Sequence, residues 1–181
     1  WLETHQADVG QRRLKLLDVA CGSGKFPSAL NQYAKLEDTK ILPIEYSLLD
    51  PSSFSIKETR KVLRFPFEAN SEFKTTLQNF ACEQGAYDII WATHALYAIP
   101  QDELKDALKR FIFGMARSGF IAHATTKSHY LRFYMHYLNG FRGGFGEPYS
   151  SAEQILQILK EIEIPHRVEK ITYENSISEN A

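Results

Sequence analysis

Two glycines at the end of a short apolar run are the first residues of this chain whose spacing suggests chemistry. Residues 17–24 read Leu-Asp-Val-Ala-Cys-Gly-Ser-Gly, so Asp18 lies within the apolar run, and Gly22 and Gly24 follow it. Glycines at such a turn let the backbone approach a ligand closely, and the N–H groups at the start of a following helix favour an anionic group. The segment therefore predicts a ligand-binding loop between a strand and a helix.

Two common glycine-loop motifs fit this segment poorly. A phosphate-binding P-loop needs Ser or Thr directly after its Lys and a Gly five residues before the last one, but Phe26 follows Lys25, and Val19 occupies the earlier position. The dinucleotide fingerprint needs a third small residue where Pro27 stands. Both motifs are disfavoured, although a nicotinamide-dependent oxidoreductase remains an alternative.

An acidic residue after the second predicted strand would complete a cofactor site, because a carboxylate there can accept hydrogen bonds from ribose hydroxyls. Asp50 and Glu45 are the candidates. Asp50 ends an apolar run and precedes Pro51 and Ser52, so it is expected at the carboxyl end of the strand, whereas Glu45 falls in mid-strand. We favour Asp50, with Glu45 as the alternative ribose-binding acid and a helix cap as the alternative role for Asp50.

The elements that must position these residues follow an alternating pattern. Short apolar runs alternate with amphipathic stretches, which is typical of a parallel sheet with helices on both faces. Strands are predicted at 14–20, 40–49, 62–67, 87–92, 120–124 and 166–173. Helices are predicted at 25–36, from Ser52 or Ser53 to 63, at 71–82, 101–115 and 128–138, and after a capping box of Ser150 and Glu153. The glycine-rich stretch 140–146 is either a lid or a surface loop.

The motif at 17–24 resembles the first motif of class I S-adenosylmethionine-dependent methyltransferases, an apolar strand with an acid followed by Gly-x-Gly. Later segments are similar, in order and spacing, to the histamine N-methyltransferase branch of that superfamily. They are Leu-Asp-Pro-Ser at 49–52, Glu-Ala-Asn at 68–70, Tyr-Asp-Ile-Ile at 87–90, His-Ala-Leu-Tyr at 94–97 and Tyr-Ser-Ser-Ala-Glu-Gln at 149–154. The resemblance implies a Rossmann-like, doubly wound α/β fold, S-adenosylmethionine as cofactor, and a small-molecule methyl acceptor that offers an amine nitrogen or else a hydroxyl.

The same resemblance implies which residues form the site. The residues that would contact the cofactor are Asp18, Ala20, Cys21, Gly22, Ser23, Gly24, Asp50, Pro51, Ser52, Glu68, Ala69, Asn70 and Thr93. The acceptor would contact His94, Tyr97 and Tyr130, and His94 and Tyr97 would be the catalytic residues that orient it and help to remove its proton. Ordinary packing is the alternative for these three side chains, and Cys21 is interpreted as a small residue rather than a nucleophile.

Two departures from the family bear on function. Only 13 residues precede Leu14, and the chain ends at Ala181, so we expect the helices that cover the substrate and the last strand of the sheet to be absent. The chain is interpreted as a single cofactor-binding domain over residues 1–181, either complete or part of a longer chain with further domains. The alternative function is a non-catalytic domain that keeps the fold and serves as a binding or structural module.

Composition and charge exclude several other classes of protein. Apolar residues make up 44% of the 181 residues and charged residues 24%, which excludes a disordered chain. The formal net charge of −1 offers no overall basic surface, so no nucleic-acid partner is expected. No apolar run has the length of about 18 residues that a membrane span needs, so no membrane partner is expected either.

Cysteine and histidine content indicates the compartment and argues against a metal site. Cys21 and Cys82 are too few for a disulfide framework, which favours a cytoplasmic location. The histidines outside the proposed site show neither paired helical spacing nor neighbouring cysteines: His5, His123, His129, His136 and His166. No bound metal is expected.

Overall fold

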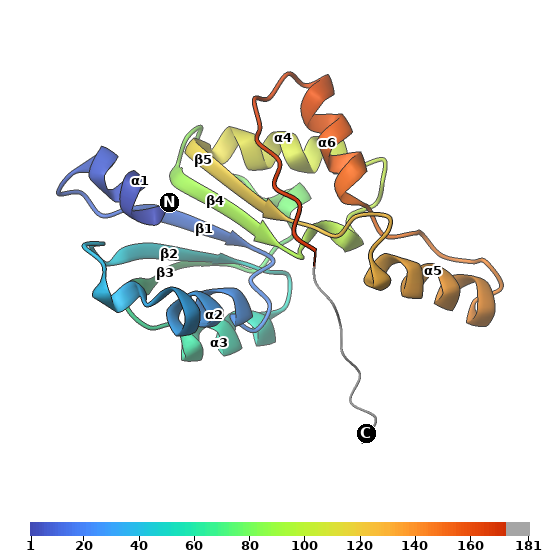
Figure 1. The fold of residues 1–181 in the computed structure, drawn as a ribbon, viewed down its shortest axis with the longest axis horizontal. Helices are drawn as coiled ribbons and strands as arrows, with labels where there is room; N and C mark the ends of the chain where they lie inside the picture. The colour runs from blue at the N-terminus through green and yellow to red at the C-terminus, as the bar shows by residue number, and fades with distance from the viewer. Residues whose placement is uncertain (173–181) are drawn as a thin grey trace.

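The computed structural model describes residues 1–172, which form an α/β fold on one parallel sheet (Figure 1). Its strands are β1 (Lys15–Val19), β2 (Ile44–Leu49), β3 (Phe67–Phe73), β4 (Tyr87–Thr93) and β5 (Met115–Ala122). Its α-helices are α1 (Leu2–Val9), α2 (Lys25–Ala34), α3 (Ser53–Val62), α4 (Leu104–Gly114), α5 (His129–Phe141) and α6 (Ala152–Glu161). The predicted Rossmann-like fold is confirmed.

The strand order creates a place for a ligand. It is β3-β2-β1-β4-β5, and every neighbouring pair of strands is parallel. The chain builds outward from β1 to β3 and then returns to the other side of β1 as β4, so the order reverses beside β1. In open α/β sheets ligands bind at this reversal, outside the carboxyl ends of the strands. We call that end of the sheet the carboxyl edge and the opposite end the amino edge.

Apolar side chains cover both faces of the sheet. On one face, Leu16, Tyr46 and Trp91 belong to a core that α1, α2 and α3 cover. On the other face, Leu17 and Ile90 belong to a core completed by α4 and α6. Figure 1 shows α2 and α3 on one side of the sheet and α4 and α6 on the other. Because the central strands are buried on both faces, they read as continuous apolar runs in the sequence.

The N-terminus of α6 is one residue later than predicted. Ser151 accepts a hydrogen bond from the Gln154 N–H, and the Gln154 side chain accepts one from the Ser151 N–H, which completes a capping box. The prediction of a box made by Ser150 and Glu153 was wrong. The Ser150 hydroxyl is engaged elsewhere, because it donates to the Leu96 carbonyl at 2.8 Å.

The predicted strand at 62–67 was also wrong. Helix α3 continues to Val62, where the next residue still closes a helical hydrogen bond, and β3 begins only at Phe67. Pro66 has no N–H to donate to a ladder and precedes the strand rather than lying inside it. Within residues 1–172, β3 is the outermost strand on its side of the sheet.

The predicted helix at 71–82 does not form. Phe73, Leu77 and Phe80 have the spacing of one helical face, and all three pack into the same core. They reach it from the end of β3, from the short 3-10 turn η2 (Leu77–Asn79) and from the segment that follows. The apolar spacing reflected a shared core rather than a helix.

The last predicted strand, at 166–173, is not observed in the part of the chain that the structure describes. Residues 166–172 follow α6 as irregular chain, and residue 173 lies outside the described residues. Within residues 1–172, β5 is therefore the outermost strand on its side of the sheet.

Candidate functional site

The glycine loop after β1 has an unusual backbone. Ala20, Gly22 and Gly24 all have positive φ angles, of 52°, 57° and 72°. The Cys21 N–H donates to the Leu49 carbonyl at 3.2 Å, which ties the loop to the end of β2. Three left-handed residues in five turn the chain sharply from β1 into α2, and the loop lies at the carboxyl edge.

Helix α3 holds this loop from the side. The Thr59 hydroxyl lies 2.8 Å from the Gly22 carbonyl and 3.3 Å from the Cys21 carbonyl. A Cβ atom at Gly24 would lie 2.5 Å from Val62 Cγ2, which is closer than real atoms approach. Only glycine therefore fits at position 24, and contacts made by the protein itself fix the loop.

Asp50 lies beside the loop at the end of β2. Its side chain is buried, Oδ2 accepts a hydrogen bond from the Gly22 N–H at 3.1 Å, and Oδ1 accepts one from the Ser52 N–H at 2.8 Å. Glu45 is paired in register with Lys15 at the amino edge, one full strand length away. Of the two acids, Asp50 alone adjoins the glycine loop.

The neighbours of Asp50 are exposed. Pro51 and Ser52 both face solvent, as does Ser23 at the tip of the glycine loop. Ser52 also accepts a hydrogen bond from the Ser55 N–H and so caps α3, as predicted. The helix cap is therefore Ser52, and the Asp50 carboxylate bridges the loop and the start of the helix.

Asp18 and Cys21 face inward rather than toward the crevice. The Tyr46 hydroxyl donates to Asp18 Oδ2 at 2.6 Å, and burial raises the pKa of Asp18 to about 7 despite this bond. Burial likewise raises the pKa of the Cys21 thiol to about 12. Cys21 therefore stays protonated at neutral pH, which fits a small packing residue rather than a nucleophile.

The structure corrects the position predicted for Glu68, Ala69 and Asn70. We expected them to follow the third strand, but they lie within β3, in the half nearer the amino edge. Glu68 is paired with Glu45 in register, and it accepts a hydrogen bond from Arg13 at 2.6 Å. Because β3 runs on to Phe73, the residues that leave it at the carboxyl edge begin with Lys74.

A second set of predicted residues, beginning with Thr93, lies where β4 ends at the carboxyl edge. Thr93 is its last residue, and His94 follows with a positive φ of 53°, which is strained for a residue that is not glycine. His94 Nδ1 lies 2.7 Å from the Tyr97 hydroxyl oxygen. That oxygen also accepts a hydrogen bond from the Ala124 N–H at 3.0 Å, which links the pair to the segment after β5.

Tyr97 is the centre of an aromatic cluster, which we define as Tyr97, His123, Tyr130, Tyr134 and Tyr149. The ring centroid of Tyr97 lies 4.0 Å from that of His123, 5.0 Å from that of Tyr130 and 5.6 Å from that of Tyr149. Tyr134 and Tyr149 stack with centroids 3.6 Å apart. The structure therefore brings the predicted acceptor residues His94, Tyr97 and Tyr130 together.

Sequence reasoning missed His123 and Tyr149. His123 donates from Nε2 to the Ser150 carbonyl at 3.0 Å, and burial lowers its pKa to about 4, so the ring is neutral at physiological pH. The signal that could have found it is its place at the end of β5, because the ends of adjacent parallel strands meet at one edge. Tyr149 begins a segment that carried the family resemblance, but its ring contacts have no local signature.

Among residues 1–172, no group of three His, Cys, Asp or Glu side chains is arranged to hold a metal ion. The polar groups at the carboxyl edge are instead the Asp50 carboxylate, the Glu153 carboxylate that accepts from the Thr126 N–H, backbone N–H groups, hydroxyls and imidazoles. Such an edge suits an uncharged or cationic organic ligand with hydroxyl groups.

Comparison with solved structures shows the fold. One similar structure is an S-adenosylmethionine-dependent methyltransferase of Thermotoga maritima, described as a possible histamine N-methyltransferase. Its sequence is 15% identical, the TM-score is 0.56, and the superposition covers 88% of this chain and 68% of the other. Magnesium protoporphyrin IX methyltransferase of Synechocystis, solved with bound SAH, is 18% identical with a TM-score of 0.57, covering 86% and 65%. An S-adenosylmethionine-dependent methyltransferase of Methanosarcina mazei is 15% identical with a TM-score of 0.57, covering 86% and 81%.

The family follows from the sequence comparison. No curated protein matches the chain. A family model described as a methyltransferase domain, however, matches residues 4–164, which include every strand and all six α-helices in whole or in part. The chain therefore belongs to the methyltransferase domain family.

Proposed function

We propose that this chain binds S-adenosylmethionine at its carboxyl edge and transfers the methyl group to a small molecule, with an amine nitrogen as the first choice of acceptor atom and a hydroxyl as the second. The observation that carries the proposal is Asp50, a buried carboxylate beside the glycine loop at the strand-order reversal. In a member of this family, a carboxylate at that position suits the ribose of the cofactor.

The residues at this edge fit the cofactor. Each oxygen of Asp50 accepts one backbone hydrogen bond, and a carboxylate offers about four acceptor positions, so two remain for two ribose hydroxyls. A Cβ at Gly22 would meet only the Ala20 carbonyl oxygen, at 3.9 Å, so the loop surface there is open to a ligand. Ser23, Pro51 and Thr93 lie at the same edge and complete the proposed cofactor site.

Two of the residues first assigned to the cofactor take supporting roles in this proposal. Asp18 is buried behind the loop and hydrogen-bonded to Tyr46, so it supports the β1 end of the site from within. Cys21 is buried and tied to β2 through its N–H. Glu68, Ala69 and Asn70 leave the proposed site, because they lie in the amino half of β3.

His94 and Tyr97 are the proposed catalytic residues. When bound, the cofactor supplies an electrophilic methyl group, so the chemical work left to the protein is positioning and proton removal. An amine acceptor carries one proton too many after it gains a methyl group. His94 and Tyr97, in contact at 2.7 Å, are suited to orient the acceptor nitrogen and to take up that proton.

The aromatic cluster supports an amine as acceptor. Tyr130 exposes 45% of its surface beside Tyr97, so part of the cluster is open to a ligand. Aromatic ring faces attract flat rings and cationic groups, and a methylated amine becomes cationic. The cluster therefore favours both the acceptor and its product.

Calorimetric titration with S-adenosylmethionine and with its demethylated product tests the cofactor site. We expect Asp50→Ala to weaken binding by about 100-fold or more, because two hydrogen bonds to a charged group are lost. Asp50→Asn keeps one acceptor oxygen, and it should bind with intermediate affinity. Glu45→Ala is the matched control at the amino edge and should bind like the unchanged chain. Equal affinity for the Asp50→Ala variant and the unchanged chain would refute the site.

A methyl-transfer assay with a panel of small amines and alcohols tests the reaction. We expect product from at least one amine, and a large drop in kcat for His94→Ala with cofactor affinity retained. Cofactor binding without product from any acceptor would favour the alternative of a non-catalytic binding module. An unchanged rate for His94→Ala would remove that residue from the mechanism.

A further inference from the structure

Helix α5 and the loop after it carry a dense set of exposed aromatic rings. Phe133, Phe141 and Phe145 expose 64%, 83% and 78% of their surfaces. Residues 130–145 hold six of the exposed large apolar side chains: Tyr130, Phe133, Met135, Tyr137, Phe141 and Phe145. Figure 1 shows α5 projecting from the body of the molecule beyond the carboxyl edge. Isolated exposed apolar side chains are ordinary, but five rings and a methionine within one projecting helix and the loop after it indicate an interaction surface.

The same segment is cationic although the chain as a whole is not. Residues 127–146 contain Lys127, Arg132 and Arg142 and no Asp or Glu, whereas the whole chain has a net charge of −1. None of these three cations forms an ion pair with another residue in the described part of the chain. Their charge is therefore available to an anionic partner.

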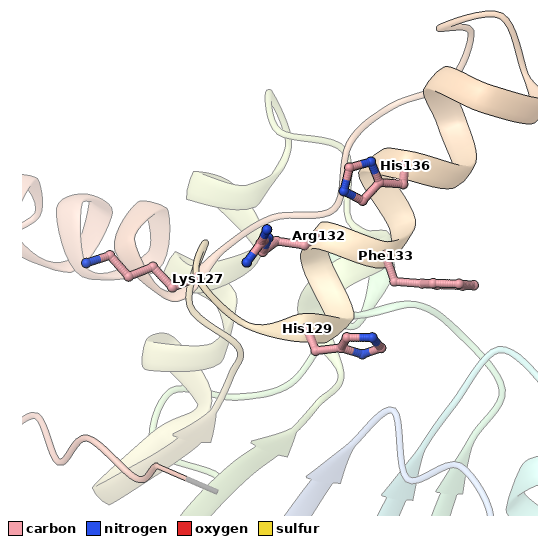
Figure 2. Close-up of a pocket in the computed structure, with 5 residues that line it drawn as sticks. All are labelled: Lys127, His129, Arg132, Phe133 and His136. Carbon is pink, nitrogen blue, oxygen red and sulfur yellow. The ribbon is translucent and has the colours of Figure 1, made fainter. Parts of the chain in front are cut away.

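A surface hollow of about 340 Å³ lies beside two of these cations, Lys127 and Arg132. It is lined by Lys127, His129, Arg132, Phe133 and His136, and all but Phe133 carry nitrogen donors. Figure 2 shows these side chains arising from successive turns of α5 and from the segment just before it. Its lining holds no carboxylate, and the exposed Phe133 ring lies beside its cations.

We infer that α5 and the loop after it, residues 127–146, dock on an anionic phospholipid membrane surface. Phenylalanine and tyrosine rings with interspersed cations are typical of segments that lie in the membrane interface. No helix among residues 1–172 is long and apolar enough to cross a bilayer. This inference replaces our expectation, based on the absence of a spanning segment, that the chain has no membrane partner.

The shape of the segment favours a membrane over other partners. A partner helix or a nucleic-acid strand is usually held in a groove, whereas α5 projects from the molecule (Figure 1), and its exposed rings Tyr130, Phe133, Tyr137 and Phe141 recur every three or four residues along it. A deformable lipid surface can accept rings from a convex element, and its phosphates match the cations. Because α5 leaves the carboxyl edge, docking would turn the proposed acceptor site toward the membrane.

Vesicle flotation tests the inference with the full chain. Vesicles of phosphatidylcholine alone are compared with vesicles that also contain phosphatidylglycerol, at low and high salt. We expect binding only to the anionic vesicles, weakened by salt because surface charges are screened. Arg132→Glu with Phe133→Ser should reduce binding about tenfold or more, since a cation is reversed and an inserting ring is lost. Lys127→Glu alone should give a smaller loss.

A matched control variant lies on α3. Phe54→Ser with Lys57→Glu changes an exposed ring and an exposed cation one turn apart, and it should bind like the unchanged chain. Thermal unfolding verifies that all variants fold. Failure of the unchanged chain to bind anionic vesicles at low salt, or equal losses on α3 and α5, would overturn the inference. So would α5-dependent dimerisation in light scattering, or α5-dependent binding of single-stranded nucleic acid in place of vesicles.

Excess inorganic phosphate distinguishes a headgroup site from membrane docking. Phosphate should compete weakly, because the rings contribute to binding only at a bilayer. Complete displacement by phosphate at the same ionic strength as a chloride control would contradict the role of the aromatic rings.

Discussion

At the amino edge of the sheet, Asp88 accepts two hydrogen bonds from Arg12, at 2.6 and 2.7 Å, and a third from the Lys15 N–H. At the carboxyl edge, Asp50 is also buried, but it accepts only two backbone hydrogen bonds and forms no ion pair within residues 1–172. Asp50 directly follows β2, and Asp88 is the second residue of β4. One is saturated by cations of the chain, and the other retains acceptor positions.

The backbone at the carboxyl edge carries strain that no helix end explains. The carboxyl edge holds Ala20 and His94 with positive φ, which costs free energy in residues other than glycine. Strained residues at the edge with unused hydrogen-bonding capacity fit the ligand site that we propose there. The other described non-glycine residues with positive φ, Lys35 and Glu163, lie instead at the C-termini of α2 and α6, where a left-handed residue commonly ends a helix.

The largest expected effect is at Gly24. Gly24→Ala would force a Cβ to 2.5 Å from Val62 Cγ2 and would hold alanine at a φ of 72°. Left-handed strain and overpacking together should lower the free energy of unfolding by about 3 kcal/mol, measured by urea denaturation. Cofactor binding should fall with it, because the loop loses its shape.

Gly22→Ala is the matched control for that change. It has a similar φ of 57°, but its Cβ would meet only the Ala20 carbonyl oxygen, at 3.9 Å. We expect a loss of about 1 kcal/mol from strain alone, with a disproportionate loss of cofactor affinity. If the two glycines lost stability equally, packing of the loop on α3 would not be the reason for Gly24.

Asp88→Ala should destabilise the amino edge of the sheet without changing the proposed cofactor site. We expect a loss of about 2 kcal/mol in the free energy of unfolding, since the Lys15 N–H and Arg12 lose their acceptor, although Arg12 is half-exposed and can still be solvated by water. Cofactor affinity should not change. Asp106→Ala, which removes an exposed pair with Lys109, is the control and should leave stability unchanged.

The pH dependence of stability gives a second measurement of Asp88. Burial alone would raise its pKa, but the hydrogen bonds from Arg12 and the Lys15 N–H outweigh it and hold the pKa below the usual value. A lowered folded-state pKa contributes stability above the ordinary carboxylate pKa, and this is lost as pH falls through the lower folded-state value. The acid limb of the stability curve should flatten in Asp88→Ala.

The parts of this molecule that were predictable are those with local signals. The loop of Gly22 and Gly24 follows an apolar run, so its place between β1 and α2 could be read directly. Asp50 was identified by its position after a run of apolar residues. Asp50 was preferred to Glu45 on this position alone, and the register of β2 agrees, because Glu45 pairs with Lys15 at the amino edge.

The parts that failed depend on contacts made at a distance. The core shared by Phe73, Leu77 and Phe80 imitates a helical face, and this displaced the third strand from 67–73 to 62–67. That one error placed Glu68 to Asn70 at the wrong edge. The aromatic cluster could not be predicted in full either, since its rings come from four segments that only the fold brings together.

The contribution of Asp18 to stability should depend on pH in the opposite direction to that of Asp88. Burial raises its folded-state pKa from 3.8 to about 7, so the folded chain binds a proton more tightly than the unfolded chain between these values. Its contribution to stability is therefore present below about pH 4 and is lost as pH rises to about 7. Asp18→Asn keeps an acceptor for Tyr46 without the charge, and it should gain about 1 kcal/mol near pH 8. Urea denaturation across this range should show the negative slope of the unchanged chain disappear, and an unchanged slope would mean that Asp18 is ionised in the folded state.

The smallest effect, at His123, separates positioning from chemistry at the carboxyl edge. His123→Phe keeps a ring against Tyr97, which stacks with it at 4.0 Å, but removes the hydrogen bond to the Ser150 carbonyl. If His123 positions Tyr97, the KM for the acceptor should rise about threefold to tenfold with little change in kcat or in cofactor affinity. His5→Phe changes another partly buried histidine, one that meets Trp1 edge-to-face and lies far along the chain from the cluster, and it should leave KM unchanged. An equal rise in KM for both variants would indicate a general loss of stability, and a fall in kcat alone would make His123 part of the proton pathway rather than a support for Tyr97.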